Sequence, residues 1–308
     1  MEYGFAFFPG QGAQAPGMGK DLYENSKAAR LVFEEASDGA GIDVAKLCFD
    51  SDKETLSRTE NSQIAIFTHS MAALAALREA GVTFKAAAGF SLGEYTSLAA
   101  AGVVTLADGV KIVSKRGKLM QHAADTIDGG MAAILGLEDA KIEEACAAVK
   151  NGIVRPVNYN CPGQVSVACA KEQLAPFSAA VKAAGGRALP LKVRGGFHSP
   201  FMATAAQGFA QVLEECQVGQ PEMPLYSNRT GAVYEGDPKP LLSQQIASPV
   251  RWETIVRNMI AAGADTFVEL GPGKTLCGLI EKIDKTVKTY ALSSQADLET
   301  ILKEVKGC

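Results

Sequence analysis

The sequence lacks the cysteine spacing that a disulfide framework or a structural zinc site needs. Its 308 residues include seven cysteines, an odd number, and no two of them form a C-x-x-C pair. Paired or clustered cysteines mark secreted disulfide scaffolds and zinc modules. We therefore expect a protein of the reducing cytoplasm, without a metal site, whose cysteines fill space rather than act as nucleophiles.

An excess of positive charge is also missing. The chain carries 30 lysines and arginines against 34 aspartates and glutamates, a formal net charge of -4. Proteins that coat nucleic acid or anionic membranes need a basic balance. No uncharged apolar stretch approaches the roughly 18 residues of a membrane span, and no basic segment precedes the first apolar run, which Pro9 and Gly10 interrupt. We expect no membrane span, no secretory signal and no nucleic-acid partner.

What is present is an ordinary globular composition. Hydrophobic residues make up 47% of the chain and charged residues 21%, near the usual values for folded domains. The length is about twice that of a usual domain of roughly 150 residues. One large domain, or a large domain with a small one inserted, is therefore expected.

Most of the chain has an α/β pattern. Residues 5–8 form a short apolar run that ends at a proline and a glycine-rich turn, as a buried strand does. Between residues 61 and 80 apolar side chains recur at helical spacing, and residues 84–89 are again short and apolar. We expect residues 266–270 to be the last strand, ahead of a G-P-G turn and a final stretch of helix.

One segment, residues 129–195, differs in pattern from the rest. Its predicted order is strand 131–137, helix 138–149, strand 154–158, strand 164–170, helix 171–184 and strand 187–193. This βαββαβ order is that of a ferredoxin-like unit, and a pair of glycines brackets it at each end. The predicted fold class is α/β, with this small domain inserted into a large one made of residues 1–128 and 196–308.

A G-x-S-x-G pentapeptide, GFSLG, occupies residues 89–93 between a predicted strand and a predicted helix. In that context the serine lies on a strained turn with its hydroxyl exposed. The helix N-terminus offers amide donors and the positive end of its dipole to a developing oxyanion. Ser91 is therefore the candidate nucleophile; the alternative is a turn serine that only caps the helix.

A serine nucleophile needs a base, and the chain has three histidines. His69 and His122 fall in predicted helices, where a histidine is more often a surface residue or a hydrogen-bonded core residue. His198 lies in the loop GGFHSP, held by glycines and a proline. Catalytic groups concentrate in loops fixed to a scaffold, so His198 is the candidate base.

No aspartate or glutamate precedes His198 within ten residues. An acid in the order Ser, acid, His would have to come from the region between Ser91 and His198, where most carboxylates fall on helices of the small unit. A backbone or amide oxygen could instead orient the imidazole. It would fix the tautomer as an acid does, with less charge stabilisation.

Two other glycine-rich motifs do not fit nucleotide sites. Residues 9–14, PGQGAQ, match a dinucleotide pattern superficially, but Pro16 falls where the first helical turns should run. Residues 273–275, GKT, end like a phosphate-binding loop, yet Val268 stands where that motif requires glycine. The first loop can instead offer a second amide donor opposite Ser91.

Six motifs are spread over the chain from end to end: FPGQG at 8–12, GFSLGEY at 89–95, RG at 116–117, NYNCPGQ at 158–164, FHS at 197–199 and GPG at 271–273. Together they resemble the malonyl-CoA:acyl carrier protein transacylase family, acyltransferases of fatty-acid and polyketide synthesis. The resemblance implies an α/β-hydrolase-like large domain with a ferredoxin-like insertion. It implies ping-pong transfer of a malonyl group from malonyl-CoA to the phosphopantetheine thiol of acyl carrier protein, through an ester on Ser91.

Carried over by motif, Ser91 is the nucleophile, His198 is its base, and the backbone amides of Gln11 and Leu92 form the oxyanion hole. Arg116 stands in a basic run, KRGK, that on charge alone indicates a solvated helix face. The resemblance instead assigns Arg116 to the free carboxylate of the malonyl group. Such a charge-assisted, bidentate contact contributes roughly 1.5 to 3 kcal/mol.

The resemblance adds four further positions. The main-chain oxygen of Gln245 would orient the histidine, so that no acid is needed. Phe197 would leave little room for a methyl branch, and Asn160 and Met120 would contact the substrate. The chain departs from many members at Phe90, where they have histidine, so no titrating group can assist from that position.

The resemblance implies no cofactor beyond the coenzyme A thioester substrate and the phosphopantetheine of the acceptor, and we expect a monomer. Carrier proteins are usually acidic, so a basic face is expected at the mouth of the site. Its candidate residues are Lys192, Arg194, Lys274, Lys282 and Lys285. Two other functions stay open: a serine hydrolase such as a thioesterase, and a non-catalytic carrier-binding module.

Overall fold

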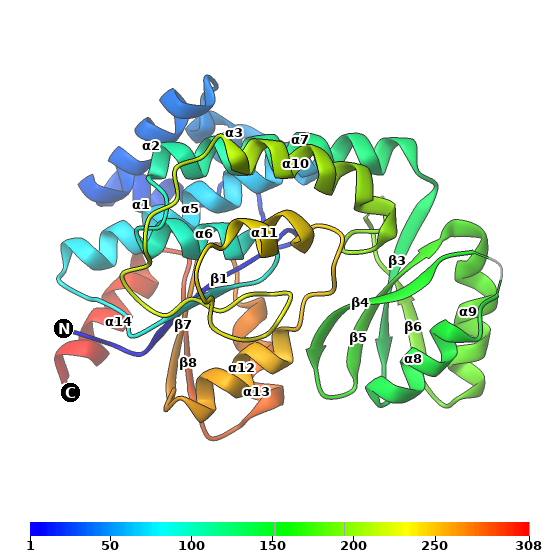
Figure 1. The fold of residues 1–308 in the computed structure, drawn as a ribbon. Helices are drawn as coiled ribbons and strands as arrows, with labels where there is room; N and C mark the ends of the chain where they lie inside the picture. Colours follow the sequence, from blue (N-terminus) through cyan, green and yellow to red (C-terminus); the bar gives the residue numbers. More distant parts are fainter. Residues whose placement is uncertain (151, 194, 308) are drawn as a thin grey trace.

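The computed structural model describes residues 1–150, 152–193 and 195–307. Arg194, one candidate for the basic face, lies outside these residues. The strands are β1 (Phe5–Phe8), β2 (Ala87–Gly89), β3 (Gly129–Leu135), β4 (Val154–Cys161), β5 (Gln164–Ala170), β6 (Arg187–Pro190), β7 (Thr266–Leu270) and β8 (Lys288–Leu292). They form a parallel sheet in the order β2-β1-β7-β8 and an antiparallel sheet in the order β4-β5-β3-β6 (Figure 1).

Helices surround both sheets. Those of the first part of the chain are α1 (Lys20–Asn25), α2 (Lys27–Ala40), α3 (Val44–Asp50), α4 (Lys53–Ser57), α5 (Thr59–Glu79), α6 (Leu92–Ala100) and α7 (Leu106–Thr126). The rest are α8 (Asp139–Ala147), α9 (Lys171–Ala183), the short 3₁₀ helix η1 (Pro200–Met202), α10 (Ala203–Glu214), α11 (Lys239–Gln245), α12 (Trp252–Ala261), α13 (Thr275–Ile283) and α14 (Gln295–Gly307). None of them, within the described residues, is long and apolar enough to cross a membrane.

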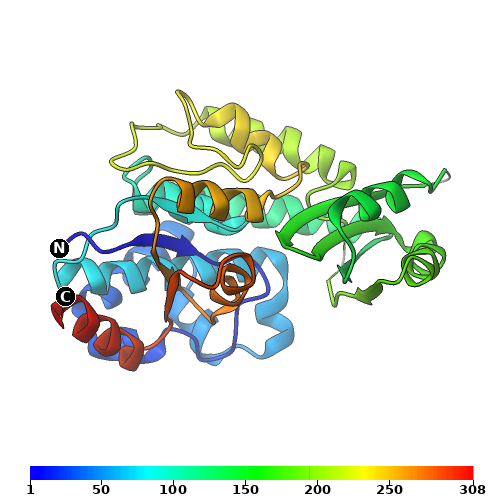
Figure 2. The same ribbon diagram turned by 90° about the horizontal axis from the view of Figure 1, so that it is seen from below.

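The parallel sheet is buried on both faces, which explains the unbroken apolar run of β1. Successive side chains of a strand point to opposite faces. Ala6 and Phe8 pack in one core cluster with α2, α5, α6 and α7, whereas Phe5 and Phe7 pack in another with α12 and α13. The large unit therefore has three layers, with helices above and below the sheet (Figure 2).

The carboxyl ends of the parallel strands bring three loops to one edge of the sheet. These are the loops that follow β1, β2 and β7. A Cβ atom added to Gly271, after β7, would lie 2.9 Å from the ring of Pro9, after β1. Such an edge is the usual place for a site in a parallel α/β sheet.

The smaller unit has the predicted order β3-α8-β4-β5-α9-β6, and all pairs in its sheet are antiparallel. Helices α8 and α9 cover one face of this sheet and share a core cluster with it. The other face carries Met131, Val157 and Ala168, which pack in the core of the large unit. The chain enters the smaller unit at residue 129 and leaves it at residue 195. These two connections lie side by side, because the Gly195 N–H donates to the Gly129 oxygen at 3.1 Å.

Some predicted bounds differ from the structure. Strand β4 runs three residues further than predicted, to Cys161, and β6 ends at Pro190 instead of residue 193. Within residues 84–89, only the last three form β2. Phe84 and Ala86 are buried and supplied the apolar signal, although they precede the paired residues of β2.

The prediction that residues 266–270 form the last strand is wrong. Strand β8 follows α13 and pairs in parallel with β7, before the chain ends in α14. Four of its five side chains are partly or fully exposed because it lies at the sheet edge. A short, half-exposed edge strand between two helices gives little apolar signal.

Candidate active site

Ser91 lies on a sharp turn between β2 and α6. Its φ of 53° and ψ of -102° fall outside the regions that side chains other than glycine favour. The turn requires both of its glycines: a Cβ on Gly93 would lie 1.9 Å from the Phe8 oxygen, and a Cβ on Gly89 would lie 1.9 Å from the carbonyl of Gly93. Local geometry of this kind stores roughly 1 to 3 kcal/mol of strain and needs support from its surroundings.

Asn228 supplies that support. The Ser91 N–H donates to Asn228 Oδ1 at 2.6 Å, and Asn228 Nδ2 donates to the Gly89 oxygen at 2.6 Å. The Asn228 side chain is fully buried. Its two bonds hold the backbone on both sides of the turn, at Gly89 and at Ser91. Asn228 was not predicted, because it stands 137 residues from Ser91 in a segment without a motif.

His198 is in hydrogen-bond contact with the serine. Its Nε2 lies 2.7 Å from Ser91 Oγ, and its Nδ1 lies 3.0 Å from the Gln245 oxygen and 3.2 Å from the Ser248 oxygen. Carbonyl oxygens can only accept, so Nδ1 carries the proton and Nε2 is free to accept the serine hydroxyl proton. Burial, and then the charge of Arg116, lower the pKa of His198 to about 4, so the imidazole is neutral at neutral pH.

Arg116 extends from α7 to the same hydroxyl. Its Nη2 donates to Ser91 Oγ at 3.2 Å and to Gln245 Oε1 at 2.9 Å, and its Nη1 donates to Gln63 Oε1 at 2.8 Å. The guanidinium lies over the Tyr95 ring, 4.8 Å from its centroid. The charge-only interpretation as a solvated residue is wrong: Arg116 is 0% exposed, because it alone of the basic run faces the core.

The two residues expected to supply the oxyanion-hole amides are Leu92, which follows the serine in the chain, and Gln11, in the loop after β1. Leu92 is the first residue of α6, and the first N–H groups of a helix have no partner within it. The loop after β1 packs on the turn, because a Cβ on Gly10 would lie 2.5 Å from the Phe90 oxygen. Gln11, the next residue in that loop, lines the same cavity as Ser91.

A cavity of about 110 Å³ opens at the serine. Its walls are mostly apolar and come from both units: Gln11, Phe90, Ser91, Met120, Met131, Asn158, Leu191, Val193, Phe197 and His198. Asn160 lines a neighbouring cavity of about 270 Å³ instead, where its Nδ2 donates to Ser166 Oγ at 3.3 Å. Of the predicted substrate residues, Arg116, Met120 and Phe197 thus lie at the serine, whereas Asn160 lines the neighbouring cavity.

A family model for the acyl transferase domain matches residues 6–303. This chain belongs to the acyl transferase family. A curated relative, the malonyl CoA-acyl carrier protein transacylase of Bacillus subtilis, is 39% identical over 304 residues, covering 97% of this chain and 96% of the relative. The corresponding enzyme of Staphylococcus aureus is 38% identical over 298 residues, covering 95% of this chain and 96% of the relative.

Solved structures of acyltransferases match the whole fold. The malonyl CoA-acyl carrier protein transacylase from Clostridium perfringens superposes with a TM-score of 0.95 and 36% identity, covering 100% of this chain and 98% of that one. A malonyl-transacylase solved with its type II PKS acyl-carrier protein has a TM-score of 0.94 and 37% identity, covering 98% of this chain and 100% of that one. The mixed α/β fold, with one parallel and one antiparallel sheet, is therefore that of these enzymes.

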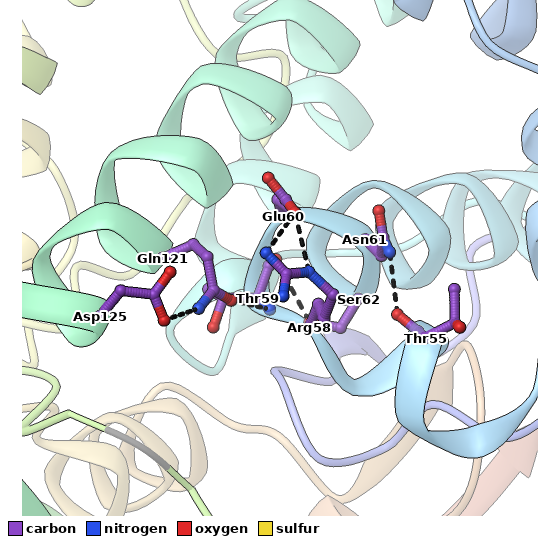
Figure 3. A network of polar contacts seen from close by, with 8 residues as sticks. All are labelled: Thr55, Arg58, Thr59, Glu60, Asn61, Ser62, Gln121 and Asp125. Atoms are coloured by element: carbon purple, nitrogen blue, oxygen red, sulfur yellow. Dashed lines mark hydrogen bonds and ion pairs between the residues drawn. The ribbon is translucent and has the colours of Figure 1, made fainter.

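A polar network joins the start of α5 to α7 (Figure 3). Gln121 of α7 accepts from the Thr59 N–H at 2.8 Å and donates to Asp125 at 2.8 Å, which ties the start of α5 to α7. The Gln11 side chain donates to Thr59 Oγ1 at 3.2 Å, which links the loop after β1 to the same network. Beside it lies a second opening of about 330 Å³, lined by residues of both units that include Lys192 and Phe197.

The remaining candidates lie away from the serine or at the surface. His69 is buried in α5 with its Nε2 3.1 Å from the Ser293 oxygen, and His122 is exposed on α7. Lys192, Lys274, Lys282 and Lys285 are all exposed. In the part of the chain that the structure describes, no three histidine, cysteine, aspartate or glutamate side chains gather closely enough to hold a metal ion.

Proposed function

We propose that this enzyme transfers a malonyl group from malonyl-CoA to the phosphopantetheine thiol of acyl carrier protein, by a ping-pong mechanism through a malonyl-Ser91 ester. One observation carries the proposal: a buried guanidinium lies 3.2 Å from the nucleophilic oxygen of a serine and histidine pair. Burying a cation is costly, and an enzyme that transfers neutral acyl groups gains nothing from one beside its nucleophile. The buried guanidinium therefore favours an acyl group that carries a negative charge. The names of the relatives and structural neighbours support the same substrate.

In the first half-reaction Ser91 Oγ attacks the thioester carbonyl carbon while His198 Nε2 takes the hydroxyl proton. The carbonyl oxygen gains the negative charge, and the amides of Gln11 and Leu92 donate to it. When the tetrahedral intermediate collapses, the C–S bond breaks and the coenzyme A sulfur receives the proton from His198. The ester on Ser91 remains.

In the second half-reaction the carrier thiol takes the place of coenzyme A. His198 accepts the thiol proton, the sulfur attacks the ester carbonyl, and collapse returns the acyl group to a thioester. The C–O bond to Ser91 breaks, and the serine oxygen regains its proton from His198.

Arg116 would set the preference for a carboxylated acyl group. A malonyl ester on Ser91 has its free carboxylate two carbons beyond the ester carbon, within reach of the guanidinium that already contacts the serine oxygen. A charge-assisted bond of roughly 1.5 to 3 kcal/mol corresponds to a preference of about ten- to a hundredfold over acetyl. Phe197, 7% exposed at the cavity wall, would limit branching of the acyl group.

Incubation with radiolabelled malonyl-CoA and an acid quench tests the proposal. Label should remain on the wild-type protein, be absent from Ser91→Ala, and move onto added acyl carrier protein faster than it appears as free malonate. Rapid release of malonate would instead identify a thioesterase. A wild type that takes up no label would indicate a carrier-binding module without catalysis.

The accessory expectations remain part of this proposal. The α/β-hydrolase-like and ferredoxin-like descriptions are supported by the parallel sheet and by the strand order of the small sheet. Exposed Lys192 lines the outer opening, and Lys282 Nζ donates to Gln164 Oε1, at 3.3 Å, beside the cavity that holds Asn160. An acidic carrier protein would approach over these lysines.

A further inference from the structure

Glu94 is a buried carboxylate that no step above uses. It lies on the first turn of α6, three residues after the nucleophile, and is 0% exposed. Burying a carboxylate is costly unless its oxygens accept hydrogen bonds. The hydrogen bonds of the Glu94 carboxylate therefore indicate its role.

Three donors converge on this carboxylate. Oε1 accepts from the Asn228 N–H at 2.9 Å and from the Tyr234 hydroxyl, and Oε2 accepts from Gln245 Nε2 at 2.8 Å. The Asn228 N–H and the Gln245 NH₂ group can only donate, so each of them needs an oxygen opposite it. Only an acceptor with two oxygens satisfies all three donors together.

Gln245 passes this constraint on to the reacting groups. Besides Glu94, its Nε2 donates to the Ser91 main-chain oxygen at 2.7 Å, so both amide protons are used. Its Oε1 must then face the other way, where it accepts from Arg116 Nη2 at 2.9 Å. Its main-chain oxygen is one of the two that hold His198 Nδ1.

We propose that Glu94 is a positioning residue, which fixes the orientation of the Gln245 amide and thereby holds the Arg116 guanidinium at Ser91. The inference rests on the proposed function, since it concerns how the cation for the malonyl carboxylate is held. It also answers why that cation can be buried. Among the described residues, Arg116 has no carboxylate within ion-pair distance.

The separation of the two charges has a chemical consequence. A carboxylate bonded directly to Arg116 would occupy the donors that the malonyl carboxylate needs. With the amide of Gln245 between them, the oxygen end of its dipole faces the cation and the N–H end faces the anion. Glu94 thus stabilises the buried charge from a distance and leaves Arg116 able to bind a substrate anion.

The Glu94→Gln variant tests this arrangement at constant size. The Asn228 N–H belongs to the backbone and cannot turn away, so the oxygen of the new amide would face it and its NH₂ would face Gln245. Gln245 must then turn its oxygen toward residue 94, which sets its NH₂ against Arg116 Nη2. We expect the preference of Ser91 for malonyl over acetyl to fall at least about tenfold, with a raised KM for malonyl-CoA.

Tyr234→Phe is the matched control, because it removes a donor from the same carboxylate on the side away from Gln245. It should leave the malonyl preference unchanged even if the two variants lower the melting temperature equally. Against an Arg116→Ala background, Glu94→Gln should cause no further loss of preference. An additional loss there, or equal loss of malonyl and acetyl transfer in Glu94→Gln alone, would show a merely structural role and overturn the proposal.

A crystal structure of Glu94→Gln gives a readout that is independent of the substrate. The contact between Arg116 Nη2 and Ser91 Oγ should be lost in the variant, and its retention would overturn the proposal. A wild-type enzyme that forms no malonyl ester contradicts the proposed function. A wild type that prefers malonyl, beside a Glu94→Gln enzyme with the same preference, contradicts the role of Glu94 alone.

Discussion

At the scale of single residues, the reacting pair works without the usual carboxylate beside the histidine. Two main-chain oxygens hold Nδ1–H of His198, which fixes the tautomer but adds no negative charge next to the ring. The nearest cation, Arg116, instead disfavours the imidazolium, and burial acts in the same direction. The outcome is a base that stays neutral and available over a wide range of pH.

The pH dependence of Ser91 acylation follows from this environment. With the pKa of His198 lowered to about 4, the base is lost only as the pH falls toward that value, well below the ordinary 6.5 of histidine. Burial raises the pKa of Glu94 to about 7, with Arg116, Tyr95 and Tyr234 as the charged or titratable groups around it. Protonation of Glu94 would put a proton on the carboxylate that accepts from Gln245 Nε2, so acylation by malonyl-CoA should rise modestly as the pH passes about 7.

Rapid-quench measurement of malonyl-enzyme formation from about pH 4 to pH 8 gives the profile. The wild type should show a modest bend near neutral pH and its main acid limb near pH 4. The bend should disappear in Glu94→Gln, while the acid limb remains. A single acid limb near pH 6.5 in both proteins would contradict the lowered pKa of His198.

At the scale of elements, the turn between β2 and α6 depends on how closely the helix approaches β1. Gly93 is the contact point, since a Cβ there would meet the Phe8 oxygen at 1.9 Å, and both partners belong to backbone. No side-chain movement can relieve such a clash. The helix N-terminus, with its free amide at Leu92, is held beside the nucleophile by this packing.

Gly93→Ala should therefore be strongly destabilising. Forcing a methyl group into a closed backbone contact costs about 3 kcal/mol or more, to be measured as the free energy of unfolding in urea. Gly278→Ala is the matched control: Gly278 lies inside helix α13, and an added Cβ meets nothing within 4 Å. That variant should gain up to about 1 kcal/mol, and similar losses in the two variants would contradict the close approach of α6.

The sequence predicted what local patterns encode. The helix at residues 61–80, the strand at 5–8 and the strand-turn-helix around Ser91 all appear in the structure, because periodicity and glycine spacing act over a few residues. Strand β8 was missed because its edge position leaves it half exposed. Arg116 was placed at the active site by the family resemblance alone, since its charge and neighbours indicate a solvated helix face.

The buried polar residues behind the site had no such signal. Asn228, Glu94 and Gln63 are all 0% exposed, yet each looks like an ordinary surface residue in the sequence. Their partners are 53 to 151 residues away in the chain. Only the assembled fold shows that they satisfy one another around the serine.

At the scale of the whole molecule, the site is a joint product of the two units. The large unit supplies the reacting groups Ser91 and His198, and the small unit closes the cavity with Met131 and Leu191. Strand β3 shows how this is arranged. Met131 points toward the large unit, whereas Ile134 points away, into the core beneath α8 and α9.

The small unit should therefore control which acyl group fits. Met131→Ala enlarges a cavity of only about 110 Å³, and we expect it to raise acylation by methylmalonyl-CoA relative to malonyl-CoA about tenfold, since one methyl group in a tight pocket is worth about 10- to 200-fold. Ile134→Ala is the control from the same strand, with a similar loss of stability of about 2 to 5 kcal/mol. Competition between the two labelled thioesters for Ser91, below the unfolding transition of both variants, measures the ratio. An equal change in the two variants would mean that the small unit acts through stability and not as a wall of the acyl site.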